Sequence, residues 1–293
     1  MRGVLFIAGI VLLLALPVSV PATDNGAILF LWKDAEIVDL LSPSLADSLK
    51  FIPAGDFAVS PAGTVLLLER DGNVLDLSRR ARLPAKTPLG VESITHSSGL
   101  LIAVRKGRIG YYEDGEIVER VELPAPGMRI AAGRGERLYA FGPMGKGSSV
   151  FLLEGGKTIR LFDLPGETIT DLSSIGERIF FAAGNRIYTA ARGEKTGLLF
   201  LAAGEDRVRS IAPDPRSGLL FFSAGDSIYA LRAGFAIAIL KGLSGYLRCG
   251  DGALYVLDPE KRRLVRVTGL EKIVLAGDAG GGASPLSPSD FKE

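Results

Sequence analysis

Charged and hydroxyl side chains recur along the chain just before short hydrophobic runs. We located them by counting back seven residues from the Gly or Glu at the start of the next hydrophobic run. For Arg209 the count is nine, because the turn in that repeat is two residues longer. The positions found are Asp56, Glu92, Arg129, Thr170, Arg209 and Gly245. Asp171 and Arg248 lie one and three residues further along their runs. Together, such groups could bind a polar small molecule or a peptide, or form ion pairs with one another.

Other arrangements that carry chemistry are missing from the sequence. One Cys and one His exclude a multi-thiolate or multi-histidine metal centre. Residues 142–149 superficially suggest a phosphate-binding loop, but Lys146 precedes Gly147 instead of Ser or Thr, and a strand-like run follows. We therefore predict no catalytic residue, no metal site and no cofactor. The alternative is a hydrolase, a lyase or a small-molecule-binding enzyme that uses carboxylates such as Asp56, Glu92 and Asp171 at one place.

The elements that must position these residues repeat along the chain. Six segments share a Gly or Glu, a hydrophobic run, a polar break and a second hydrophobic run. Their equivalent positions are Val65, Leu101, Leu138, Ile179, Leu220 and Leu254. The intervals are 36, 37, 41, 41 and 34 residues, with a mean of about 38, and a constant period in this range indicates a repeat architecture.

Each repeat contains four runs that read as β-strands. The clearest repeat has them at 208–211, 219–223, 227–231 and 235–240, separated by Pro-, Asp- and Gly-containing turns. Four short antiparallel strands per repeat of this length predict a blade of a β-propeller, an all-β fold. We expect six blades, with seven as the alternative.

The segments 27–32 and 36–41 precede the first full repeat and read as two further strands. We expect them to form an N-terminal hairpin close to the point where the ring closes.

Two repeats resemble known propeller families. The sequence VSPAGTVL at 59–66, followed by DGN at 71–73, resembles the repeats of TolB-like propellers, although Ala62 stands where that pattern has Asp. The sequence GALYVLD at 252–258, followed by RLVRV at 263–267, is similar to the NHL and six-bladed TolB-like superfamily. These resemblances imply a six-bladed propeller. They imply little about function, since propellers include enzymes, binding proteins and scaffolds.

The N-terminus has the plan of a secretory signal peptide. Arg2 precedes an apolar run over 4–16, and a Pro-containing segment with small residues ends at Ala22. We predict cleavage after Ala22, a propeller over 23–276 and a flexible Gly-, Ser- and Pro-rich tail over 277–293. The expected location is outside the cytoplasm, either periplasmic or secreted. In the alternative, the apolar segment stays as an N-terminal membrane anchor.

The charge balance limits the kinds of partner. The chain has 34 Lys and Arg against 33 Asp and Glu, and removing 1–22 removes only Arg2, which leaves 33 of each. A neutral chain has no overall field that would attract nucleic acid. We therefore expect a non-enzymatic propeller that binds a protein or peptide, or serves as a scaffold, in the cell envelope. Recognition would be local, at the channel mouth formed by Asp56, Arg129, Asp171 and their neighbours.

Overall fold

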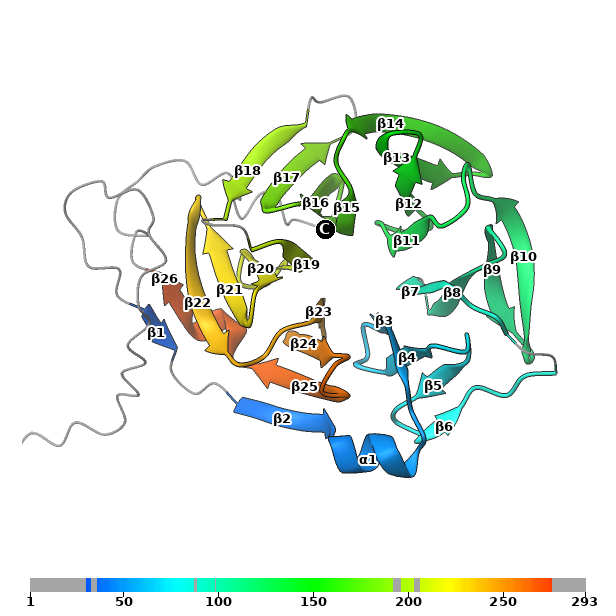
Figure 1. The fold of residues 1–293 in the computed structure, drawn as a ribbon, viewed down its shortest axis with the longest axis horizontal. Helices are drawn as coiled ribbons and strands as arrows, with labels where there is room; N and C mark the ends of the chain where they lie inside the picture. Colours follow the sequence, from blue (N-terminus) through cyan, green and yellow to red (C-terminus); the bar gives the residue numbers. More distant parts are fainter. Residues whose placement is uncertain are drawn as a thin grey trace, which may run out of the picture.

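The protein is a six-bladed β-propeller in which four-stranded antiparallel sheets surround a central axis (Figure 1). The computed structural model describes residues 30–32, 36–86, 89–97, 99–191, 196–202 and 206–275. The prediction of six four-stranded blades is confirmed, and the alternative of seven is wrong. The predicted signal peptide and the predicted tail lie outside the described residues.

The blades follow one another in sequence, and each runs from its innermost strand to its outermost. Blade 1 contains β3 (Pro53–Val59), β4 (Val65–Glu69), β5 (Val74–Asp76) and β6 (Ala81–Arg82). Blade 2 contains β7 (Ser93–Ser97), β8 (Leu100–Arg105), β9 (Arg108–Glu113) and β10 (Glu116–Glu122). Blade 3 contains β11 (Arg129–Ala132), β12 (Leu138–Met144), β13 (Gly147–Glu154) and β14 (Lys157–Pro165).

The second half of the ring has the same plan. Blade 4 contains β15 (Ile169–Ile175), β16 (Arg178–Ala183), β17 (Arg186–Ala191) and β18 (Gly197–Leu201). Blade 5 contains β19 (Val208–Asp214), β20 (Leu219–Ala224), β21 (Ser227–Arg232) and β22 (Phe235–Lys241). Blade 6 contains β23 (Tyr246–Gly250), β24 (Ala253–Asp258), β25 (Arg263–Thr268) and, as its outermost strand, β2 (Glu36–Leu41).

The ring is closed by strands from both ends of the chain. β2 pairs antiparallel with β25, so the N-terminal part of the chain completes the C-terminal blade. β1 (Phe30–Trp32) pairs with β26 (Ile273–Leu275), which follows the 3-10 helix η1 (Leu270–Lys272). The two predicted N-terminal strands therefore do lie at ring closure. They do not pair with each other as a hairpin, because each finds its partner near the C-terminus.

One short helix, α1 (Pro43–Ser48), connects β2 to the first blade. The hydroxyl of Ser42 caps its N-terminus by accepting a hydrogen bond from the backbone N–H of Leu45, at 3.2 Å. Among the described residues, no helix has both the length and the apolar character needed to cross a membrane.

The hydrophobic core lies between neighbouring blades. Phe57 of blade 1 packs in one cluster with Tyr255 of blade 6, and Phe180 of blade 4 packs in another with Phe222 of blade 5. All four side chains are almost completely buried. Burial of this kind contributes roughly 25 cal/mol per Å² of apolar surface. Each blade thus depends on its neighbours to cover its faces, which makes a closed ring the stable arrangement.

The five long outermost strands all contain a β-bulge. One extra residue interrupts the ladder with the neighbouring strand in each case. These residues are Leu40, Arg120, Leu161, Leu199 and Ile239. A bulge twists a strand and discourages pairing of its free edge with other chains. The outer rim of the propeller is therefore protected at regular positions.

Candidate functional site

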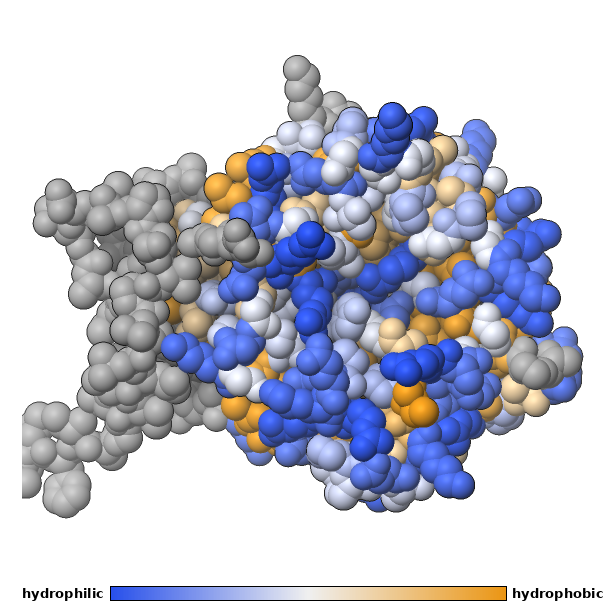
Figure 2. Space-filling view, viewed as in Figure 1, coloured by the Kyte–Doolittle hydropathy of each residue, from blue (hydrophilic) through white to orange (hydrophobic). Residues whose placement is uncertain are grey.

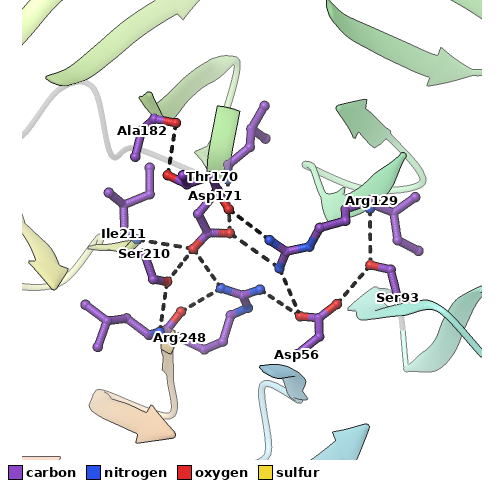
Figure 3. Close-up of polar contacts among 12 residues, drawn as sticks. Asp56, Ser93, Arg129, Thr170, Asp171, Ala182, Ser210, Ile211 and Arg248 are labelled. Atoms are coloured by element: carbon purple, nitrogen blue, oxygen red, sulfur yellow. Dashed lines mark hydrogen bonds and ion pairs between the residues drawn. The ribbon is translucent and has the colours of Figure 1, made fainter. Parts of the chain in front are cut away.

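Six side chains of the innermost strands form one layer around the axis, and Figure 3 labels Asp56, Ser93, Arg129, Asp171 and Ser210 among them. They come from β3, β7, β11, β15, β19 and β23, one from each blade. In chain order they are Asp56, Ser93, Arg129, Asp171, Ser210 and Tyr246. Arg248, two residues further along β23, also reaches into this layer. We call these seven residues the axial cluster.

The carboxylate of Asp56 connects blades 1 and 2. Its Oδ2 accepts hydrogen bonds from the hydroxyl of Ser93 at 2.9 Å and from the backbone N–H of Ile94 at 3.1 Å. Its Oδ1 accepts from the N–H of Phe57 at 3.0 Å. The oxygen of Ser93 accepts in turn from the N–H of Ile130 in blade 3, at 3.4 Å. One carboxylate and one hydroxyl thus join three blades.

Asp171 repeats this arrangement in blades 4, 5 and 6. Its Oδ2 accepts from the hydroxyl of Ser210 and from the N–H of Ile211, the latter at 3.1 Å. Its Oδ1 accepts from the N–H of Leu172 at 3.0 Å. The oxygen of Ser210 accepts from the N–H of Leu247 at 2.9 Å. The axial cluster therefore consists of two similar halves.

Two arginines join the halves by bridging both carboxylates. Arg248 donates from Nη2 to Oδ1 of Asp56 and from Nη1 to Oδ2 of Asp171, both at 3.1 Å. Arg129 places Nη2 at 3.4 Å from Oδ1 of Asp56 and at 3.9 Å from Oδ1 of Asp171. Two negative and two positive charges alternate around the axis, so the cluster is neutral (Figure 3).

The surroundings favour the charged form of Arg129. Burial by itself lowers the pKa of Arg129, but the negative charges of Asp56 and Asp171 outweigh it and raise that pKa above the usual arginine value. The guanidinium of Arg129 also lies 5.4 Å from the ring centre of Phe141, and that of Arg248 lies 5.6 Å from the ring centre of Phe57. These cation–π contacts add to the ion pairs.

Tyr246 closes the layer at the junction between blades 6 and 1. Its ring lies 5.9 Å from the guanidinium carbon of Arg129 and packs directly against Gly55. Gly55 has φ +89°, and a Cβ at this position would lie 2.7 Å from Cε2 of Tyr246. A residue other than glycine would therefore displace the tyrosine from the axis.

The structure brings together four of the seven residues predicted from the sequence, namely Asp56, Arg129, Asp171 and Arg248. Thr170 lies beside them, and its carbonyl accepts from Nη1 of Arg129 at 2.9 Å. Its hydroxyl instead donates to the carbonyls of Val208 and Ala182.

Glu92 and Arg209 are not bonded to the axial cluster. Glu92 is exposed and accepts from the N–H of Lys106 at 3.0 Å, and Arg209 pairs with Glu260 at 3.6 Å. The residues that occupy the layer in these two repeats are Ser93 and Ser210, which directly follow Glu92 and Arg209 in sequence. In these two repeats, counting back from the Gly therefore reached one residue too far toward the N-terminus.

Two irregularities explain the error in the count. Thr170 and Arg209 are the extra residues of β-bulges at the starts of β15 and β19, so they are turned away from the layer. The turn after the innermost strand also varies in length. It joins Val59 to Val65 in blade 1 but Ile175 to Arg178 in blade 4.

A different signal marks all six positions of the layer. A polar or charged residue is followed each time by Phe, Ile or Leu. The six pairs are Asp56-Phe57, Ser93-Ile94, Arg129-Ile130, Asp171-Leu172, Ser210-Ile211 and Tyr246-Leu247. The second member is buried between blades in every case. The same kind of pair also occurs on other strands, as at Arg178-Ile179 and Arg186-Ile187, so it indicates Ser93, Ser210 and Tyr246 only in combination with the repeat.

The chemistry available at the axis is restricted by these contacts. Each carboxylate oxygen of Asp56 and Asp171 already accepts at least one hydrogen bond from the protein itself. Within the described part of the chain, no group of three or more His, Cys, Asp or Glu residues is arranged to hold a metal ion. Burial, followed by the negative charge of Asp214, raises the pKa of Cys249 well above the usual value, so its thiol stays protonated.

Comparison with known proteins identifies the fold but no family. No protein-family model matches the sequence, and no curated protein matches it. A structure provisionally described as a gluconolactonase superposes with a TM-score of 0.61 at 16% identity, covering 83% of this chain and 93% of that one.

Two further structures extend the comparison. A TolB-type protein from Agrobacterium tumefaciens, also provisionally described, gives a TM-score of 0.55 at 13% identity, with 83% and 99% of the two chains covered. A chain of the nidogen–laminin complex gives 0.51 at 14% identity, with 72% and 97% covered. The resemblance to six-bladed propellers is thus confirmed at the level of the fold.

Proposed function

We propose that this protein is an exported, non-enzymatic β-propeller that binds a protein or peptide, or serves as a scaffold, in the cell envelope. The observation that carries the proposal is that the two axial carboxylates are fully engaged in contacts within the protein. Asp56 and Asp171 are buried, paired with two arginines and bonded to backbone N–H groups and serine hydroxyls. They hold blades together and are not left free to act on a ligand.

This arrangement differs from what catalysis at a propeller axis requires. A metal-dependent site needs carboxylate oxygens that point at the ion, and an acid–base site needs a carboxylate within reach of the substrate. At this axis a ligand would first have to displace an arginine from two ion pairs. The other arginine would still pair with both carboxylates, so the cost is below the roughly 3–5 kcal/mol of a fully unpaired buried charge, but the ligand would have to supply it.

The comparisons are compatible with binding or with catalysis. One similar structure is described as a gluconolactonase, and another comes from a complex of two proteins. The neutral charge of the processed chain favours a local recognition surface. The mouth above the axial cluster offers the partly exposed side chains of Arg129 and Arg248 for this purpose.

Export is tested by producing the full chain with a C-terminal tag in a bacterial host and separating its compartments. We expect the protein in the envelope or the medium, with an intact mass that begins at Thr23. An unprocessed chain in the cytoplasm would contradict export.

Catalysis is tested on the same preparation. We expect no change in the melting temperature between calcium and EDTA, and no acceleration of gluconolactone hydrolysis beyond that of an Asp171→Asn variant. A calcium-dependent rise of several degrees, or hydrolysis that is absent from an Asp171→Asn variant shown to be folded, would favour the enzyme alternative.

A further inference from the structure

The outer rim of the propeller has two different arcs. The outer strands of blades 2 and 3, β10 and β14, each carry at least three charged residues. Figure 2 shows that the right-hand margin, over β10, is mainly hydrophilic. In contrast, β18 has no charged residue, β22 has one, Lys241 at its end, and β2 has two, Glu36 and Asp39.

Large hydrophobic side chains are exposed on the second arc. They lie on β18, β22 and β2, the outer strands of three consecutive blades. They are Leu198, Leu201, Phe235, Ile37 and Val38, with exposed fractions of 58, 53, 48, 49 and 38%. No large hydrophobic residue is comparably exposed on β10 or β14. We call these five residues the apolar arc.

The N-terminal part of the chain joins the propeller on the same side. Figure 1 shows β1 and β26 outside blades 5 and 6, next to β22. Ile273 of β26 is buried and packs in one cluster with Ile239 of β22 and Val267 of β25. Because β1 pairs with β26, the strand β1 lies on the same side of the propeller as β22 (Figure 1).

The distance from this point to the apolar N-terminal segment is short. Residues 4–20 are predominantly apolar, and only residues 21–29 separate them from Phe30. Nine residues span at most about 32 Å even when fully extended. While the chain carries its N-terminal segment in a membrane, β1 is therefore held close to the bilayer, and so are the strands beside it.

We propose that the apolar arc is a membrane-contacting side of the propeller, and that its occupant is the surface of a lipid bilayer. Half-exposed leucine, isoleucine and phenylalanine side chains insert readily at the boundary between headgroups and acyl chains. The processed chain has no net charge, and the arc has no cluster of basic residues, so we expect neutral lipids to suffice. The proposal rests on the exported state proposed above, but not on the absence of catalysis.

The test uses the exported, processed protein that begins at Thr23, with Cys249→Ser and a single new cysteine that carries an environment-sensitive fluorophore. Leu198→Cys reports on the apolar arc. Leu100→Cys is the matched control, because Leu100 is 44% exposed but lies on β8 of blade 2. In phosphatidylcholine vesicles, we expect the label at 198 to shift to shorter wavelength and to be quenched by brominated lipid roughly threefold more than the label at 100.

Adding Leu201→Glu and Phe235→Glu to the 198 reporter should reduce its quenching to the level of the control. Changing the salt from about 50 to about 500 mM should leave the 198 signal unchanged, since no ionic attraction is involved.

Several outcomes would overturn the proposal. These are equal quenching at both positions, no association with vesicles, and a 198 label already shielded without lipid in a concentration-dependent way. The last would identify a second copy of the chain as the occupant. None of these results would alter the intact mass or the calcium response that test the proposed function.

Discussion

The two halves of the axial cluster each join three blades through the same series of hydrogen bonds, and they differ at one position. In blades 1–3, Asp56 binds Ser93, which binds the N–H of Ile130; in blades 4–6, Asp171 binds Ser210, which binds the N–H of Leu247. The aspartates are 115 residues apart (171 − 56) and the serines 117 (210 − 93), which is about three repeats. The propeller thus has an approximate two-fold symmetry.

The difference lies at the third position of each half. The first half has Arg129 there, and the second has Tyr246, whereas its arginine, Arg248, comes from two residues later. Both arginines nevertheless bridge the same two carboxylates. The comparison indicates that charge balance at the axis is the requirement, and that the position supplying the charge can vary.

Loss of a carboxylate should have the largest effect. Asp171→Ala leaves both arginines short of a partner and removes the acceptor for Ser210 and two backbone N–H groups. We expect a loss of about 3–5 kcal/mol in the free energy of unfolding. Asp56→Ala should cost slightly less, because Asp56 is 5% exposed and Asp171 is fully buried. Urea unfolding of both variants measures the difference; a larger loss for Asp56→Ala would contradict this ranking.

Loss of one arginine should have an intermediate effect, since the other still bridges both carboxylates. Arg248→Met should cost about 2–3 kcal/mol, and Arg129→Met less, because its distances to the carboxylates are longer. The matched control is Arg263→Met, which removes the exposed pair with Asp39 and should cost below about 1 kcal/mol.

The double variant of Arg129 and Arg248 sharpens this result. It should lose more than the sum of the single variants, because the second arginine compensates for the first only while it is present. Simple additivity would show that the two arginines act independently.

Replacement of a serine tests the symmetry directly. Ser93→Ala and Ser210→Ala each remove one hydrogen bond to a carboxylate and one accepted from a backbone N–H, so each should cost about 1–2 kcal/mol. Ser210→Ala should be the costlier, since Ser210 accepts at 2.9 Å and Ser93 at 3.4 Å. If one substitution proved neutral and the other severe, the halves would not be equivalent.

The smallest expected effect on stability is that of replacing His96. The equivalent position in the other half, 117 residues later, is Pro213. Burial lowers the pKa of His96, and its Nδ1 has no hydrogen-bond partner. Below about pH 6.5, the unfolded chain binds a proton that the folded protein resists, so stability falls as the pH decreases from there towards the folded pKa. His96→Gln should reduce this slope below about pH 6.5 in thermal unfolding experiments. An unchanged slope would exclude His96 as its source.

The sequence was sufficient for the ring and for most of its turns. The repeat predicted the blades, and Gly184 and Asn185, residues typical of tight hairpin turns, connect β16 to β17. All four charges at the axis were among the predicted residues, but Ser93, Ser210 and Tyr246 were missed, and Glu92 and Arg209 were included although they lie outside the cluster. A constant count cannot follow bulges at Thr170 and Arg209, which are decided by packing between blades.

The closure of the ring has a consequence for the order of folding. The contact between Asp39 of β2 and Arg263 of β25 joins residues 224 positions apart. Ordering a loop of this length costs about 5 kcal/mol in chain entropy, and the contact cannot form before the last blade has been synthesised. Local blade contacts can form early, but this one is late by necessity. Until it forms, the molecule is an open arc of blades that can unfold from either end. After it forms, every blade packs against a neighbour on both sides, and no exposed end remains at which unfolding can begin.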